Sequence, residues 1–260
     1  MIRNLTMQHF DTSTNFVYFS DMEENNEKCR GKKKCVTSTP VGHYRACAII
    51  GNGGILLNSN CGNEIDYHDY VIRINMAPVK NYEKDVGTKA NMTLVNLALA
   101  KRLPRKLSDT TTREALVERL SPLNHGVISY IKGMSNQVKE ALLALETSLA
   151  NNGLNISITY SRDYLPRKIT RLLSATLIPE LQSPTSGLIA FILGTTFCDV
   201  ITLYGFFPFA TDMRNRTLFY HYYDRTPVSH RNRHNFSVEY DFLTTLHKSG
   251  AIKLVSDVCY

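Results

Sequence analysis

From Ala46 onward, short apolar runs alternate with longer stretches of helical character. Apolar runs of four to six residues are typical of buried strands, and the longer stretches are typical of helices packed against them. The pattern predicts strands at residues 47–50, 70–75, 92–97, 127–131, 156–160, 200–204 and 252–255. It predicts helices at residues 112–119, 137–149, 167–177, 186–197 and 238–248. Such alternation predicts an α/β, Rossmann-like domain with a mostly parallel central sheet flanked by helices.

The length and the net charge of the chain limit the classes of protein to which it can belong. With 260 residues, 43% of them hydrophobic, it can bury one large core, so we expect a single compact domain. Its longest apolar runs are far shorter than the roughly 20 residues that cross a bilayer. The formal net charge of +7 favours acidic partners, which could be nucleic acid, anionic lipid or an anionic small substrate. No zinc, RNA-recognition or helix-turn-helix signature is present, so nucleic-acid binding is not expected.

Residues 1–43 differ in composition and periodicity from the rest of the chain. They show no sustained periodicity and are rich in Asn, Thr, Ser and Glu, which predicts an irregular arm or stem before a folded domain over residues 44–260. Within the arm, residues 28–35 hold five cations, and we expect a solvated loop that a pairing of Cys29 with Cys35 could close.

Signals for the secretory pathway are mixed. No signal peptide is visible in residues 1–30, because no charged segment leads into an apolar one. The chain nevertheless contains five Asn-x-Ser/Thr sequons, which matter only in that pathway and also arise by chance: Asn4, Asn91, Asn155, Asn215 and Asn235. A secretory assignment therefore requires a targeting segment beyond these residues.

A glycine-rich turn, Gly51-Asn52-Gly53-Gly54, follows the first predicted strand. Parallel α/β folds often bind nucleotides at such a turn, because glycines let the backbone approach a phosphate. The turn lacks the G-x-G-x-x-G spacing of dinucleotide-binding sites, so a dinucleotide oxidoreductase is not favoured. Without further evidence, a plain tight turn is at least as good an interpretation.

Two longer segments, the first of which contains this turn, resemble motifs of a known protein family. The first, which aligns without a gap over residues 47–96, resembles the large sialylmotif of animal sialyltransferases. It runs from Cys47-Ala-Ile-Ile-Gly-Asn-Gly-Gly through Val71-Ile-Arg-Ile-Asn75 to Asp85-Val-Gly-Thr-Lys89. The second is similar to the small sialylmotif and runs from Pro184-Thr-Ser-Gly-Leu188 through Cys198 to Leu203-Tyr-Gly-Phe-Phe-Pro208.

Two shorter motifs follow in the order that this family shows. His221-Tyr-Tyr-Asp224 resembles the third sialylmotif, and His234 followed five residues later by Glu239 resembles the very small one. The residue sequence of the large motif and the His-Tyr-Tyr-Asp form of the third motif resemble those of the alpha-2,8-sialyltransferase branch. The resemblance implies a Rossmann-like, GT-A-like catalytic domain over residues 44–260. It also implies transfer of sialic acid from CMP-sialic acid to a sialylated glycolipid or glycoprotein, with inversion.

The resemblance assigns the catalytic roles to two histidines. His234 lies where the family places the base that takes the proton of the acceptor hydroxyl, and His221 where it contacts the donor phosphate. His230 lacks a Glu at the matching distance, so we expect it to be dispensable. Without the motifs, His234 would be interpreted as a cap or surface residue and His221 as a packed residue of an aromatic strand.

The other donor-binding positions implied by the resemblance lie after predicted strands or at a helix start, and they are Asn52, Asn75, Asn96, Thr185, Ser186, Gly187 and Phe207. Asn side chains could hydrogen-bond the donor or acceptor, although Asn after a strand is often only a turn residue. Hydroxyls and amides at a helix start could hold the sugar carboxylate, and the alternative interpretation is that Thr185 or Ser186 only caps the helix. Phe207 stands where the family commonly has Trp and keeps the stacking face.

The resemblance also implies two disulfides, Cys47 with Cys198 and Cys61 with Cys259. It implies no cofactor besides the co-substrate, and no metal is expected, because Asp66-Tyr-His-Asp69 does not have Asp-x-Asp spacing. Family members are Golgi luminal enzymes held by a membrane anchor, which these residues do not contain. The alternative function is that of a catalytically weakened relative that binds sialylated glycans without transfer.

Overall fold

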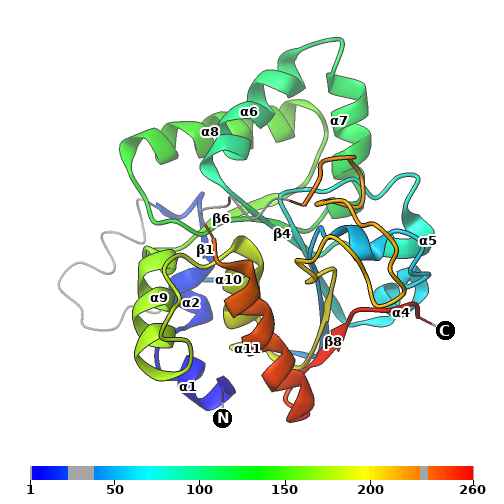
Figure 1. Cartoon of the computed structure of the whole chain (residues 1–260). Helices are drawn as coiled ribbons and strands as arrows, with labels where there is room; N and C mark the ends of the chain where they lie inside the picture. Colours follow the sequence, from blue (N-terminus) through cyan, green and yellow to red (C-terminus); the bar gives the residue numbers. More distant parts are fainter. Residues whose placement is uncertain (1, 23–37, 229–233, 260) are drawn as a thin grey trace.

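The computed structural model describes residues 2–22, 38–228 and 234–259 and contains one eight-stranded sheet (Figure 1). The strands lie in the order β1-β6-β5-β4-β3-β2-β7-β8, and all neighbours pair in parallel except β1, which runs antiparallel to β6. Their bounds are β1 Val17–Tyr18, β2 Tyr44–Ile50, β3 Tyr70–Ile74, β4 Met92–Val95, β5 Val127–Tyr130, β6 Ser157–Tyr160, β7 Cys198–Tyr204 and β8 Lys253–Val255. The predicted α/β class and the mostly parallel sheet are confirmed.

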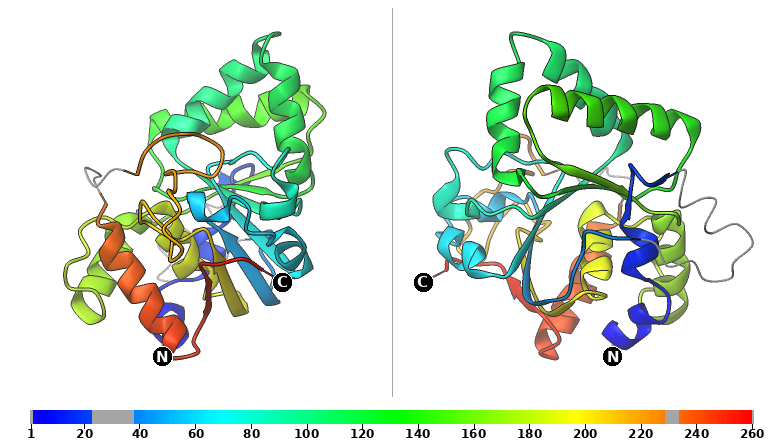
Figure 2. Two further views of the ribbon diagram at one scale, coloured as in Figure 1. Left: turned by 45° about the vertical axis from the view of Figure 1, so that its right-hand side comes forward. Right: turned by 180° about the vertical axis from the view of Figure 1, so that it is seen from behind.

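Helices cover both faces of the sheet. Their bounds are α1 Ile2–Met7, α2 Thr12–Asn15, α4 Gly62–Tyr67, α5 Glu83–Val86, α6 Leu97–Ser108, α7 Arg113–Leu120, α8 Asn136–Asn151, α9 Leu165–Thr176, α10 Ser186–Gly194 and α11 Phe236–Lys248. Helices α6, α7 and α8 pack on one face, and α1, α9, α10 and α11 lie on the other (Figure 2). Helix α10 is buried along most of its length, from Leu188 to Gly194, which agrees with its apolar sequence.

Helix α6 is not among the predicted elements. The prediction extends a strand to residue 97, but β4 ends at Val95 because the Asn96 side chain accepts a hydrogen bond from the Leu99 N–H and caps a new helix. Pro104 lies inside this helix, where proline normally argues against helical structure. Buried Leu103 and Leu107, which flank the proline, hold the helix against the sheet.

The predicted irregular arm is wrong for residues 2–22. These residues form α1, α2 and β1, and β1 adds an edge strand to the central sheet. Phe16 and Val17 are fully buried in the domain core. The elements are each too short to show periodicity in the sequence, so only their tertiary contacts define them. Residues 23–37, with Cys29, Cys35 and the cations between them, lie outside the described residues.

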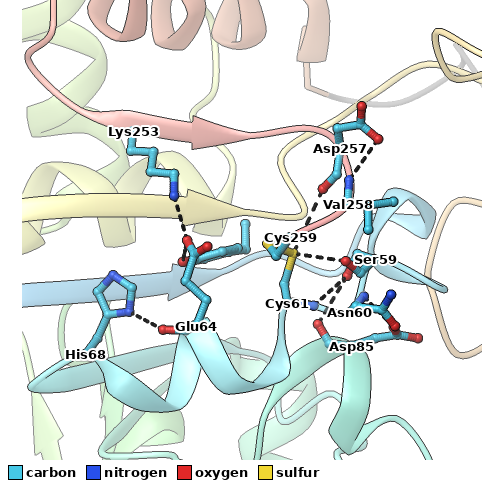
Figure 3. The surroundings of a disulfide bond; sticks show 11 residues. Ser59, Asn60, Cys61, Glu64, His68, Asp85, Lys253, Asp257, Val258 and Cys259 are labelled. Carbon is cyan, nitrogen blue, oxygen red and sulfur yellow. Dashed lines mark hydrogen bonds and ion pairs between the residues drawn. A yellow bond between two sulfur atoms is a disulfide. The ribbon is translucent and has the colours of Figure 1, made fainter.

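Both predicted disulfides are present. Cys47 on β2 is linked to Cys198 at the start of β7, and the Cα atoms are 6.0 Å apart. Cys61, just before α4, is linked to Cys259 near the carboxyl end of the chain (Figure 3). Beside this second link, the Asp85 carboxylate accepts hydrogen bonds from the backbone N–H groups of Asn58 and Asn60, so the loop that presents Cys61 is held on both sides.

We expect peptide mapping without reductant to recover these two links and no exchange between them. The digestion must cut between Cys47 and Cys61, and chymotrypsin at Leu56 or Leu57 does so, whereas trypsin leaves both in one peptide. Reduction should lower the free energy of unfolding by about 2–5 kcal/mol for each link, because both close long loops. Free thiols at these four positions, or a Cys47–Cys61 pair, would contradict the architecture.

Candidate active site

A cleft of about 830 Å³ lies at the carboxyl edge of the parallel strands. Each of four neighbouring strands, β2 to β5, is followed within two residues by a polar side chain of its lining: Asn52, Asn75, Asn96 and Lys132. The start of α10, the loop after β7 and the residues that precede α11 supply the opposite side. The cleft brings together all nine residues predicted for catalysis and donor binding, which are Asn52, Asn75, Asn96, Thr185, Ser186, Gly187, Phe207, His221 and His234.

The glycine-rich turn after β2 is shaped by a close approach of two backbones. A Cβ atom on Gly51 or Gly53 would lie 2.7 Å or 2.6 Å from the carbonyl oxygen of Gly205, which follows β7. Gly205 itself has a φ of +74°, which suits glycine. The glycines therefore allow the turn to pack against the β7 loop, and they leave the Asn52 side chain at the cleft.

The first two asparagines of the cleft, Asn52 and Asn75, are held differently. The Asn52 Nδ2 donates to the Ile74 carbonyl at 3.2 Å, so the turn after β2 is tied to the end of β3. Asn75 adopts a left-handed conformation with a φ of 53°, which Asn tolerates better than most residues. Its buried Oδ1 has no hydrogen-bond partner in the described part of the chain, and such an atom is costly unless a ligand or water satisfies it.

Thr185 begins helix α10 and is fully engaged by the protein. Its hydroxyl accepts from the Leu188 N–H at 3.0 Å and donates to Glu239 Oε2 at 2.6 Å. The sequence left open whether Thr185 caps the helix or holds a ligand, and the structure shows the cap. The Ser186 hydroxyl makes no hydrogen bond to the described residues, and Ser186 and Gly187, the first residues of the helix, line the cleft. A Cβ on Gly187 would lie 2.7 Å from the ring of Phe206, so a side chain there would require that ring to shift.

Glu239 is a buried carboxyl that joins two motifs. It lies on α11, is 5% exposed, and also accepts the Thr185 N–H at 2.8 Å. Burial raises the pKa of Glu239 to about 7, although the hydrogen bonds from Thr185 oppose the shift. Glu239 thus fixes the start of α10 relative to the start of α11, five residues after His234.

His234 is oriented by a backbone carbonyl. Its Nδ1 lies 2.9 Å from the Ser183 carbonyl oxygen, which can only accept, so Nδ1 carries a proton. A neutral ring then presents a lone pair on Nε2, which makes no hydrogen bond to the described residues. The side chain lines the cleft, so Nε2 can accept a proton there. The comparison residue His230 lies outside the described residues.

His221 is oriented by a carboxylate and an aromatic ring. Its Nδ1 lies 2.6 Å from Asp224 Oδ2, and its ring stacks on Tyr223 with centroids 4.8 Å apart. Burial would raise the pKa of Asp224, but hydrogen bonds from His221 and Thr226 lower it on balance, so the carboxylate is ionised near neutral pH. This arrangement leaves Nε2 of His221 to contact a ligand, with a negative charge behind the ring.

Phe207 belongs to an aromatic cluster at the cleft. Its ring packs edge-on against Phe209 and Tyr240, at centroid distances of 5.0 Å and 5.7 Å. Phe207 and Tyr240 also line the cleft. The cluster provides an apolar wall without an indole N–H.

Two charged residues of the large motif make hydrogen bonds outside the cleft lining. The Arg73 guanidinium is buried and donates to the carbonyls of Val86 and Lys89. Asp66 accepts from the N–H groups of Thr88 and Lys89. Sequence reasoning assigned no role to these residues, or to Glu239 and Lys132. Lys132 directly follows a predicted strand, but a lysine there is also typical of a solvated surface, and the other three residues carry no comparable signal in the sequence.

The described parts of the chain contain no group of three His, Cys, Asp or Glu side chains that could hold a metal ion. Asp66 and Asp69 both accept hydrogen bonds from backbone N–H groups. Among the described helices, none combines the length and the apolar character that a membrane crossing requires.

Comparisons with known proteins agree with these motifs. Residues 3–251 match the profile of Glycosyltransferase family 29 (sialyltransferase). The chain is 30% identical to an alpha-N-acetylneuraminide alpha-2,8-sialyltransferase of Xenopus tropicalis over 83% of this chain and 61% of the relative. It is 31% identical to the protein of that name from Bos taurus, over 83% of this chain and 60% of the relative. The chain thus spans about three fifths of the length of these curated relatives.

Solved structures are similar in fold. A crystal structure of a mammalian sialyltransferase aligns with 98% of this chain and 85% of the other, with a TM-score of 0.52 and 20% identity. A second, of a mammalian sialyltransferase in complex with Gal-beta-1-3GalNAc-ortho-nitrophenol, aligns over the same shares with a TM-score of 0.53 and 19% identity. At these identities the similarity supports the fold alone.

The raised pKa of Glu239 predicts a pH-dependent stability. The carboxyl binds its proton more tightly when folded, with a pKa of about 7 against the model-peptide value of 4.5. The stability that this proton contributes is therefore full below about pH 4.5 and is lost as the pH rises to about 7. Relative to Glu239→Gln, which does not titrate, the wild type should lose about 3 kcal/mol of unfolding free energy across that interval. Urea unfolding of both proteins at a series of pH values tests this, and parallel curves would contradict it.

Proposed function

Because the chain belongs to Glycosyltransferase family 29, the sialyltransferases, we propose that it transfers sialic acid from CMP-sialic acid to a sialylated glycan and forms an alpha-2,8 linkage. The observation that carries this proposal is the convergence of four separated motifs on one cleft. The relatives' names supply the linkage. The cleft contains side chains that we assign as a base, a phosphate contact and a site for the sugar carboxylate.

In the proposed reaction the acceptor hydroxyl attacks the anomeric carbon of the donor from the face opposite the phosphate. A carbon–oxygen bond forms to the acceptor, the bond to the phosphate oxygen breaks with its electron pair, and CMP departs. Nε2 of His234 takes the proton of the acceptor hydroxyl. The hydrogen bond from Nδ1 to the Ser183 carbonyl supports this role, because it fixes the ring and leaves the lone pair on Nε2.

His221 is proposed to contact the phosphate that leaves. Its Nε2 can donate a hydrogen bond to a phosphate oxygen when the ring is protonated at both nitrogens, and the Asp224 carboxylate balances that charge. Asn52 and the unpartnered oxygen of Asn75 supply further polar contacts to the bound sugars or nucleotide. These contacts come from separate strands, so binding depends on the sheet.

The donor carboxylate is proposed to bind at the start of α10. Ser186 and Gly187, the first residues of this nine-residue helix, line the cleft, and a helix N-terminus favours negative charge. Asn96 caps α6 with its side-chain oxygen, so its Nδ2 group remains for a ligand acceptor. Phe207 is proposed to pack against an apolar face of the donor.

The compartment and the absence of a metal requirement are part of the same proposal. The two disulfides favour an oxidising compartment, and we place the domain in the Golgi lumen, tethered by an anchor outside the described residues. A donor with one phosphate can be held by His221 and neutral donors. We therefore propose that no metal or other cofactor takes part.

Removal of the proposed base gives the sharpest test. His234→Ala should lower kcat by roughly 100-fold or more while the KM for CMP-sialic acid changes little, because the donor contacts remain. The matched control is His247→Ala, an exposed histidine on the same helix α11. CMP release from CMP-sialic acid, with and without a sialylated acceptor, is the measurement. Equal activity of the wild type and His234→Ala would refute the assigned base. A wild type that binds sialylated glycans without releasing CMP would favour the glycan-binding alternative.

Removal of divalent cations by a chelator tests how the protein stabilises the departing phosphate. Transfer should be unchanged in excess EDTA, and CMP should compete with the donor, since both use the His221 contact. His221→Ala should weaken inhibition by CMP as well as turnover. Activity that disappears with EDTA and returns with manganese would show that a cation, rather than His221, stabilises the departing phosphate.

A further inference from the structure

Lys132 occupies a position in the cleft that the proposed chemistry has not used. It follows β5 as Asn52, Asn75 and Asn96 follow β2, β3 and β4, so it extends the row of polar residues by one strand. An isolated backbone bridge to Tyr164, which precedes α9, fixes its place. It is the single lysine or arginine among the described residues of the cleft lining.

The ammonium group of Lys132 has no carboxylate partner within the parts of the chain described. Several other cations are paired, such as Lys168 with Asp163 at 2.5 Å and Lys253 with Glu64 at 2.7 Å. The one described carboxyl of the cleft lining, Glu239, is buried and held by Thr185. Lys132 thus presents an unbalanced positive charge to the cleft, which favours an anionic group of a ligand.

That anion is not expected to be the donor phosphate. Neighbouring strands lie about 4.8 Å apart, so the backbone of Lys132 is roughly 14 Å from that of Asn52, three strands away. The proposed phosphate contact His221 lies on the Asn52 side, where the N–H of the next residue, Tyr222, donates to the Asn52 carbonyl. A single phosphate does not bridge this span.

The base is connected to both ends of the cleft. Toward His221, its ring lies 6.0 Å from that of Phe236, and Phe236 contacts the ring of Tyr220, the neighbour of His221, at 6.1 Å. The connection toward Lys132 runs through backbone carbonyls. His234 is held by the Ser183 carbonyl, and the adjacent Gln182 carbonyl accepts from Thr170 of α9 at 3.5 Å. Tyr164, the bridge partner of Lys132, precedes the same helix. Lys132 is therefore connected through α9 to the segment that orients the base, and the base marks where the acceptor binds.

We infer that Lys132 binds the carboxylate of the terminal sialic acid on the acceptor glycan and so selects sialylated acceptors. This inference rests on the proposed function and adds a specificity-determining residue to it. An ammonium–carboxylate contact in a partly enclosed cleft would distinguish a sialylated acceptor from a neutral one.

The test compares a natural sialylated acceptor with the methyl ester of its terminal sialic acid, which lacks the negative charge. In the wild type, the ester should have a KM roughly 10- to 100-fold higher. Lys132→Met should raise the KM of the natural acceptor by a similar factor and remove the difference between acid and ester. Lys132→Arg should retain the difference, and Lys101→Met on the exposed face of α6 should match the wild type.

The KM for CMP-sialic acid, and donor hydrolysis without acceptor, should change less than twofold in Lys132→Met. An equal rise in the donor KM would overturn the inference, because Lys132 would then hold a donor anion. Continued discrimination between acid and ester by Lys132→Met would also overturn it. If Lys132→Met does not fold, Lys132→Gln replaces it in the same comparison. A wild type that releases no CMP from the donor would instead refute the proposed function itself.

Discussion

The site depends on the contact between β2 and β7, the strand pair next to the edge strand β8. At the carboxyl end of these strands, Gly51 and Gly53 pack against the carbonyl of Gly205 at distances that exclude any side chain. Near the other end, the disulfide between Cys47 and Cys198 links the same two strands. Gly51 of the large motif and Gly205 of the small motif are 154 residues apart in sequence, and this strand pair brings the two motifs onto one surface. A Cβ atom at Gly51 would lie 2.7 Å from the Gly205 carbonyl oxygen, so Gly51→Ala would push the ends of these two strands apart. The substitution would therefore disrupt the cleft although it removes no side chain that contacts a ligand.

A second constraint sets the base relative to the donor site. Buried Glu239 accepts both the N–H and the hydroxyl of Thr185, and so ties α11 to α10. Burial raises the pKa of Glu239, so burying the ionised carboxylate costs free energy. The protein keeps the carboxyl there, and no other described group holds the start of α10 in this way. In physical terms, the separation of five residues between His234 and Glu239 puts the base before the helix and the carboxylate in its first turn.

The sequence predicted the class of fold and the composition of the cleft, and it failed where structure arises from tertiary contacts. Strand and helix patterns beyond Ala46 are long enough to show periodicity, and the carboxyl ends of parallel strands must share an edge, so the convergence of Asn52 and Asn75 was predictable. Helix α6 was missed because Pro104 interrupts its pattern. The short elements of residues 2–22 were missed because their burial depends on a sheet edge far away in sequence. Lys132 was missed because a lone lysine after a strand resembles any solvated residue.

The motifs divide into residues that form the frame and residues that face the ligand, and this division explains which substitutions the cleft can tolerate. In the segment that resembles the small sialylmotif, Thr185-Ser186 has the two hydroxyl residues in the reverse of the Ser-Thr order that the resemblance implies. Thr185 serves as N-cap and as donor to Glu239, and Ser and Thr both meet those needs. The following position keeps a hydroxyl at the cleft and loses only a methyl group. The exchange therefore alters local packing by one methyl on each side and leaves the set of donors and acceptors unchanged, so the structure gives no reason for this exchange to abolish donor binding.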